Sequence, residues 1–201
     1  MELRNLIEVH LDLPRLARDL DQLGHLGRDW AVRQWSRATM ATLWDAAKGF
    51  RPVTVDDLVP LSVPPLVEMV HEGKSSHVAL TAVQRLFCRP CESTATDLVY
   101  GFGRHALSSL TGPGYHVAHP SAEAGEVALD YAMLPSEKPT HWPPLEQSSA
   151  RLGHFLYRER IDVLRGVSAH VSIGRTKKTQ SGWTDQWFVL VREDWQRVRS
   201  A

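Results

Sequence analysis

The spacing of apolar residues changes along the chain and separates helical from strand-forming parts. From Leu13, apolar residues recur at Leu16 and Leu20, the spacing of a helix that buries one face. A second pattern of this kind continues to Gly49, a residue that commonly ends helices. Two glycines near residue 25 separate the two patterns. We therefore predict a helical hairpin over residues 13–49.

Residues 50–66 break both periodicities, because this stretch contains four prolines. Fifty residues are too few to form a stable core alone, so the N-terminal helices need the rest of the chain. We therefore predict that 50–66 is an extended connector on the surface of one domain that spans residues 1–201.

Between residues 67 and 134 the pattern changes to short apolar segments separated by turn residues, which is typical of a strand meander. The clearest segment places Val127, Leu129 and Tyr131 on one face and Asp130 on the other. Residues 121–125 are short enough for a hairpin. The strands before and after them are therefore expected to pair antiparallel.

Apolar residues in 146–168 lie near one helical face, so we predict a late helix there, followed by a closing β-hairpin over 171–192. The fold class is then α+β. It consists of a curved antiparallel sheet, open or partly closed into a barrel, with the helical hairpin and the late helix packed on it.

Composition narrows the classes of partner. The 201 residues carry 23 basic and 23 acidic side chains, a balance that offers no whole-domain attraction for nucleic acid or an anionic membrane. There is no run of 18 apolar residues and no signal-peptide pattern at the start of the sequence. We therefore expect a cytoplasmic protein with neither nucleic acid nor membrane as partner.

Two glycine motifs fail the tests for nucleotide binding. The stretch 73–76 ends like a phosphate-binding loop, but Glu68 stands where that loop needs its first glycine. The stretch 101–106 spaces its glycines like a dinucleotide site, but Gly112 follows too soon for the long helix that such a site requires. No cofactor is therefore expected.

Cys88 and Cys91 have the spacing of a redox motif or of half a zinc site, which His116 and His119 could complete. Residues three apart on a strand point to opposite faces, so the two histidines cannot bind one ion without a bend. We therefore expect no metal, and at most one of the two histidines to face a pocket.

The remaining polar and aromatic residues suggest a cleft between the sheet and the helices, lined from Tyr100 to Tyr131. Arg104 or Lys74 could hold an anionic group there, and His105 or His116 could transfer protons. The candidate catalytic residues are His105, His116 and Asp130. The candidate ligand-binding residues are Lys74, Tyr100, Arg104, Tyr115, Tyr131 and Trp142.

Three functions fit this pattern. The first is binding of an unknown small molecule in the cleft, and the second is an enzyme that uses the same cleft. The third is an interaction or assembly subunit, which includes a homo-oligomer. Convergence of at least two of Lys74, Arg104, His105, His116 and Asp130 would favour the enzyme.

Overall fold

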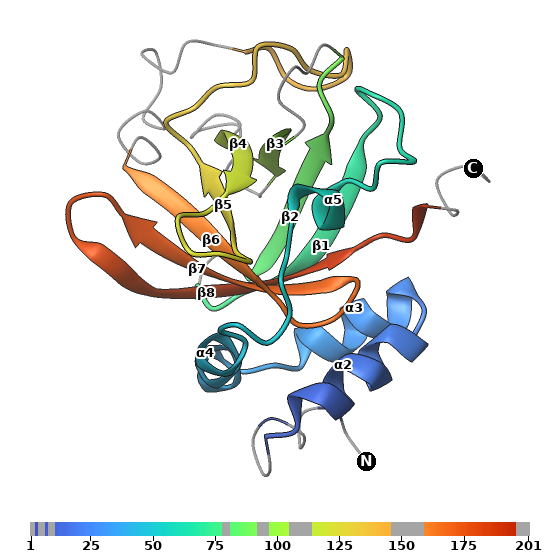
Figure 1. Ribbon diagram of the computed structural model, residues 1–201, viewed down its shortest axis with the longest axis vertical. Coiled ribbons are helices and arrows are strands. Elements are labelled where there is room, and N and C mark those ends of the chain that lie inside the picture. Colours follow the sequence, from blue (N-terminus) through green and yellow to red (C-terminus); the bar gives the residue numbers. More distant parts are fainter. Residues whose placement is uncertain are drawn as a thin grey trace.

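The computed structural model describes residues 3, 7, 11–77, 81–91, 97–104, 114–145 and 159–195. Eight strands form a closed antiparallel barrel in which each strand pairs with the next along the chain (Figure 1). Pairing of the first and last strands closes it, with His71 opposite Arg192. The strands are β1 (Met69–Ser75), β2 (Ala82–Cys88), β3 (Val99–Arg104), β4 (Gly114–Pro120), β5 (Val127–Asp130), β6 (Arg160–Gly166), β7 (Val171–Lys178) and β8 (Gly182–Arg192).

The predicted antiparallel sheet is therefore confirmed, but it is a fully closed barrel rather than an open or partly closed sheet. The predicted pairing across residues 121–125 is present, since His119 of β4 lies opposite Ala128 of β5. The closing hairpin is present as β7 and β8.

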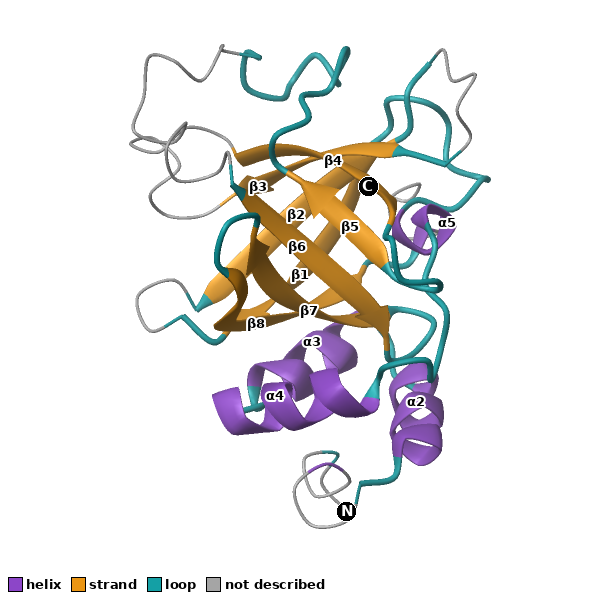
Figure 2. Cartoon of the chain, turned by 60° about the vertical axis from the view of Figure 1, so that its left-hand side comes forward, coloured by secondary structure: helices purple, strands orange, loops and turns teal. Residues whose placement is uncertain are grey.

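Helices α2 (Leu13–Gln22), α3 (His25–Arg33) and α4 (Arg37–Ala46) cover the outside of the barrel at β1, β7 and β8 (Figure 2). The predicted hairpin is therefore three short helices. Gly24 is the N-cap of α3, and Ser36 starts α4 with a capping box. The fully buried residues Trp35, Met40 and Leu43 fill the space between these helices and the barrel wall.

The proline-rich connector contains a short helix, α5 (Val55–Leu58), at one end of the barrel (Figure 2). Its apolar side chains and those around it join the core inside the barrel. The connector therefore closes this end of the barrel. It does more than link the helices to the strands.

The late helix predicted over 146–168 is wrong at residues 160–166, which form β6; residues 146–158 lie outside the described part of the chain. β6 is buried on both sides. Leu164 belongs to the core inside the barrel and Val163 to the core under the helices. A strand that is buried on both faces need not alternate between apolar and polar residues, so its sequence is easily mistaken for a helix.

The wall of the barrel separates an inner core from two outer ones. The inner core includes Phe87, Leu129, Tyr131 and Phe188. One outer core lies under α2–α4, and the other lies on the outer face of β2–β4. The face assignment predicted for β5 is confirmed, because Val127, Leu129 and Tyr131 all belong to the inner core.

Candidate functional site

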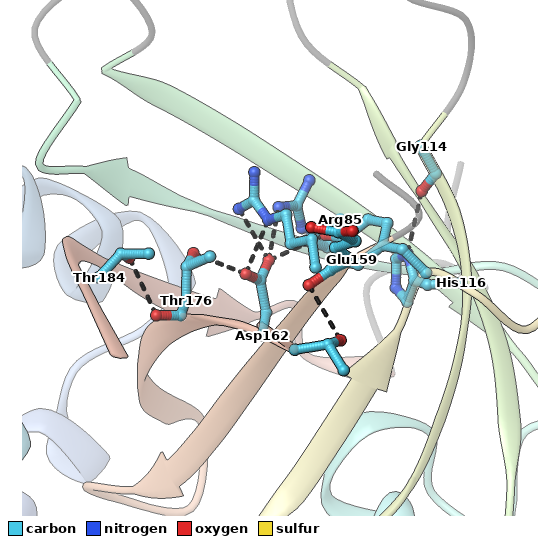
Figure 3. A network of polar contacts seen from close by, with 10 residues as sticks. Arg85, Gly114, His116, Glu159, Asp162, Thr176 and Thr184 are labelled. Atoms are coloured by element: carbon cyan, nitrogen blue, oxygen red, sulfur yellow. Dashed lines mark hydrogen bonds and ion pairs between the residues drawn. The ribbon is translucent and has the colours of Figure 1, made fainter. Parts of the chain in front are cut away.

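A charged cluster centred on Asp162 lies inside the barrel, at the end opposite α5 (Figure 3). Asp162 is fully buried. Its Oδ1 accepts hydrogen bonds from Arg160 Nε at 2.9 Å and Thr176 Oγ1 at 2.7 Å. Its Oδ2 accepts from Tyr131 Oη at 2.9 Å, Arg160 Nη2 at 2.9 Å and Arg85 Nη2 at 3.3 Å. Both carboxylate oxygens are thus satisfied, as a buried charge requires.

Strand register explains how these side chains meet. Arg160 and Asp162 are two residues apart on β6 and so share the inner face, and Thr176 lies directly opposite Asp162 on β7. Arg85 reaches Asp162 from β2, a strand that does not pair with β6. Its guanidinium occupies space over Gly103, where a Cβ atom would collide with it. The glycine on β3 therefore provides the room for a long charged side chain inside the barrel.

His116 lies on the inner face of β4, beside this cluster (Figure 3). Its ring centroid is 5.0 Å from that of Tyr131 and 5.5 Å from that of Phe87. A Cβ atom on Gly101 would lie 2.6 Å from His116 Nε2, so this position also needs a glycine. As predicted, the two histidines of β4 differ: His116 is fully buried, whereas the half-buried His119 contacts the Pro120 carbonyl oxygen through Nδ1 at 2.8 Å.

The hydrogen bonds of His116 define its tautomer. Nδ1 is 3.0 Å from the carbonyl oxygen of Gly114, which can only accept, so Nδ1 carries the proton and donates it. In a neutral ring Nε2 is then an acceptor. It is buried and has no hydrogen-bond partner among the described residues, and neither has Nε of Arg85.

Charge and burial set the protonation states. Burial, together with the positive charge of Arg85, lowers the pKa of His116 to about 3, so the ring is neutral at neutral pH. Burial opposes ionisation of Asp162, but the charges of Arg160 and Arg85 outweigh it and hold the pKa of Asp162 well below its usual value. Burial raises the pKa of Tyr131, which therefore stays protonated. Among the described residues, the guanidinium groups of Arg85 and Arg160 thus share the single carboxylate of Asp162.

Comparison with known proteins shows no family for this chain. No protein-family model matches the chain. No curated protein matches its sequence. The function therefore has to be inferred from the chemistry of these side chains.

Of the residues predicted to form a site, His116 and Tyr131 come together, but inside the barrel and not between barrel and helices. Lys74 donates through Nζ to the carbonyl oxygens of Arg33 at 2.8 Å and Trp35 at 2.9 Å, so it caps the end of α3. His105 lies outside the described residues.

Arg104 and Asp130 do not join the cluster. The side chain of Arg104 is exposed, with its guanidinium 5.8 Å from the ring of Phe102, which belongs to the outer core on β2–β4. Asp130 uses Oδ1 to accept a hydrogen bond from the backbone of Ala132 at 2.8 Å. Neither residue lies where it could touch a ligand bound beside Asp162.

Tyr100, Tyr115 and Trp142 gather on the outer face of the barrel. Trp142 packs edge-on against Phe102 with ring centroids 4.7 Å apart, and its Nε1 donates to Glu68 at 2.6 Å. These aromatic side chains hold residues 131–145 against the outer face of β2–β4. In the structure they serve packing, and they do not face the cluster.

Arg85, Arg160, Asp162 and Thr176 were not predicted from the sequence. Two of them lie on β6, which resembled a helix, and the pairing of Arg85 with Asp162 spans 77 residues. The available signal was weak: charged residues standing at inward positions of otherwise apolar strands.

The cysteine–histidine combination does not assemble. Cys88 packs in the outer core and His116 lies inside the barrel, so the wall separates them. Burial raises the pKa of Cys88 to about 12, which makes its thiol unreactive at neutral pH. Within the described ranges, no three His, Cys, Asp or Glu side chains are grouped to hold a metal ion. Among those same residues, no helix is long and apolar enough to cross a membrane.

Proposed function

We propose that the protein binds a small molecule beside the Asp162 cluster, at the end of the barrel opposite α5. The observation that carries this proposal is a pair of buried hydrogen-bonding atoms, Arg85 Nε and His116 Nε2, that have no partner among the described residues and lie in a charged cluster. Buried polar atoms are normally satisfied, so exceptions in a charged cluster indicate a role other than packing. Eight-stranded barrels are also of a size that can hold one small ligand.

The two unpartnered atoms define the chemistry of the ligand. Arg85 Nε donates a hydrogen bond, and the unprotonated His116 Nε2 accepts one. A molecule that satisfies both has a carboxylate or carbonyl oxygen next to a hydroxyl or N–H group. The guanidinium of Arg85 favours a carboxylate over a carbonyl group, so 2-hydroxy acids are the simplest class that fits.

Binding is favoured over catalysis because most of the candidate catalytic residues do not meet at the Asp162 cluster. An enzyme was expected to bring together at least two of Lys74, Arg104, His105, His116 and Asp130, and of the four that the structure describes only His116 lies in the cluster. With its pKa lowered to about 3, the His116 ring is neutral at neutral pH and is a weak base.

A thermal-shift titration tests the proposal. The probes are 2-hydroxy acids from lactate to phenyllactate, with the corresponding 2-methoxy acids, which lack the hydroxyl donor. A free ligand concentration of 100 times Kd stabilises the folded protein by about 2.7 kcal/mol. This corresponds to roughly 5–10 °C in Tm for a chain of this size.

Variants show whether the binding uses the proposed atoms. Arg85→Met should abolish the shift, and Lys178→Met, an exposed cation at the same end of the barrel, should preserve it. The methoxy acids should bind more weakly than the hydroxy acids. The proposal fails if no hydroxy acid stabilises the protein, or if Arg85→Met responds as strongly as the unmodified chain.

A further inference from the structure

A pocket of about 280 Å³, counted with its open mouth, lies at the other end of the barrel, beside α5. It is lined by the inner faces of β1, β7 and β8, by the turn after β6 and by the connector. The polar groups in its wall come from Arg51, Asp57, His71, Ser168, His170, Ser172 and Arg192. It is separate from the Asp162 cluster and shares no residue with it.

The positive charges in this pocket exceed the negative ones. Arg51 and Arg192 are the cations and Asp57 is the anion, with Arg51 Nη2 at 3.5 Å from Asp57 Oδ1, a long and weak contact. Arg192 forms no ion pair with any described residue. Its Nη2 donates to the Ala169 carbonyl oxygen at 3.2 Å, and its Nε is buried without a partner in that part of the chain.

Asp57 and Asp194 both favour the charge of Arg192, but each has another cationic partner. Asp194 pairs with Arg28 at 2.5 Å and lies 3.4 Å from His170. His71 adds no charge, because burial lowers its pKa to about 3, and its Nε2 donates to the Leu58 carbonyl oxygen at 2.9 Å. Burial likewise lowers the pKa of His170. Counting only the side chains that line it, the pocket therefore has one excess positive charge, together with spare guanidinium donors and two serine hydroxyl groups.

We propose that this pocket binds a phosphate-sized oxyanion through Arg51, Arg192 and Ser172. Guanidinium groups present paired N–H donors that match two oxygens of a phosphate, and such charge-assisted hydrogen bonds are about twice as strong as neutral ones. The Ser172 hydroxyl, on the inner face of β7, supplies a further donor in the wall of the same pocket. The oxyanion neutralises the excess charge and gives Arg192 Nε its missing partner.

Isothermal titration calorimetry on the full chain tests this site, with inorganic phosphate, glycerol 3-phosphate and chloride as probes at equal ionic strength. Phosphate should bind with a Kd on the order of 0.1–1 mM, and chloride should give no saturable heat. If the ester binds as well, the site accepts the phosphate group of an organic molecule. If only phosphate binds, the pocket is specific for the free ion. Absence of saturable phosphate binding overturns the proposal.

Variants identify the residues responsible. Arg51→Gln and Arg192→Gln should each weaken phosphate binding about tenfold, the loss expected for one charge-assisted contact. Lys178→Gln, on an exposed cation far along β7 from Ser172, should leave the Kd unchanged. If Arg192→Gln does not fold, Arg51→Gln and Ser172→Ala test the site instead, because Arg51 is half-exposed and its substitution is better tolerated. Unchanged affinity in Arg51→Gln and Ser172→Ala excludes this pocket as the site.

Discussion

At the scale of single residues, Asp162 is the side chain on which the interior of the barrel most depends. Its carboxylate pairs with the guanidinium groups of the buried Arg85 and the partly exposed Arg160, and it accepts hydrogen bonds from Tyr131 and Thr176. Asp162→Ala should lower the free energy of unfolding by about 3–5 kcal/mol, because it removes the carboxylate that pairs with the buried charge of Arg85. Urea unfolding followed by tryptophan fluorescence measures the change.

Asp130 provides the matched control, since it lies on the outer side of the neighbouring strand and accepts one local hydrogen bond. Asp130→Ala should cost less than about 1 kcal/mol. Equal losses at the two positions would contradict the view that Asp162 holds the cluster together.

At the scale of elements, the sequence predicted strands well where their two faces have different environments. β5 alternates between inner-core residues and Asp130, and β4 separates His116 from His119, and both patterns were predicted from the two-residue period. β6 was mistaken for part of a helix because both of its faces are mostly buried and each carries apolar and charged residues, so its sequence does not alternate. The break before α4 was missed because a capping serine inside a long apolar pattern resembles an ordinary helical residue.

The capping box of α4 gives a test at this scale. Ser36 Oγ accepts from the Thr39 backbone N–H at 3.0 Å, and Thr39 Oγ1 accepts from the Ser36 backbone N–H at 3.2 Å. Ser36→Ala should therefore reduce the stability of the protein by about 1 kcal/mol. Ser36→Asp retains a capping acceptor and should cost much less. Comparison of the urea midpoints distinguishes the two, and similar losses would mean that the cap contributes little.

At the scale of the whole molecule, closure of the barrel creates the candidate site. The alternation along each strand separated His116 from His119 and grouped Tyr131 with Val127 and Leu129, but it left open which face of β4 is the inner one. The meeting of His116 and Tyr131 with Arg85 and Asp162 depends on the register of all eight strands and on the two glycines of β3 that admit large side chains. Local patterns contain no information on such a cross-barrel pairing, so the partners remained unpredicted.

The same closure buries His71 and His116, and this makes the stability of the whole molecule depend on pH. Burial lowers the pKa of each ring from 6.5 to about 3. Between these values the unfolded chain binds protons that the folded chain does not, so stability falls as the pH decreases from 6.5 towards 3. Well below pH 6.5, each of the two rings should lower the free energy of unfolding by about 1.4 kcal/mol for every unit of decrease in pH. Burial shifts the pKa of His170 in the same direction.

Urea unfolding at several pH values between 7 and about 5.5 tests this dependence, in a range where the carboxylates of the unfolded chain, with ordinary pKa values near 4, stay mostly ionised. The slope of unfolding free energy against pH gives the number of protons taken up on unfolding. His71→Gln and His116→Gln should each reduce this number by about one, whatever constant loss of stability the substitution causes. The double variant should reduce it by about two. If the unmodified protein, the two single variants and the double variant all gave the same slope, these rings would be equally protonated in the folded and unfolded states. That result would contradict the view that His71 and His116 are buried as neutral imidazoles.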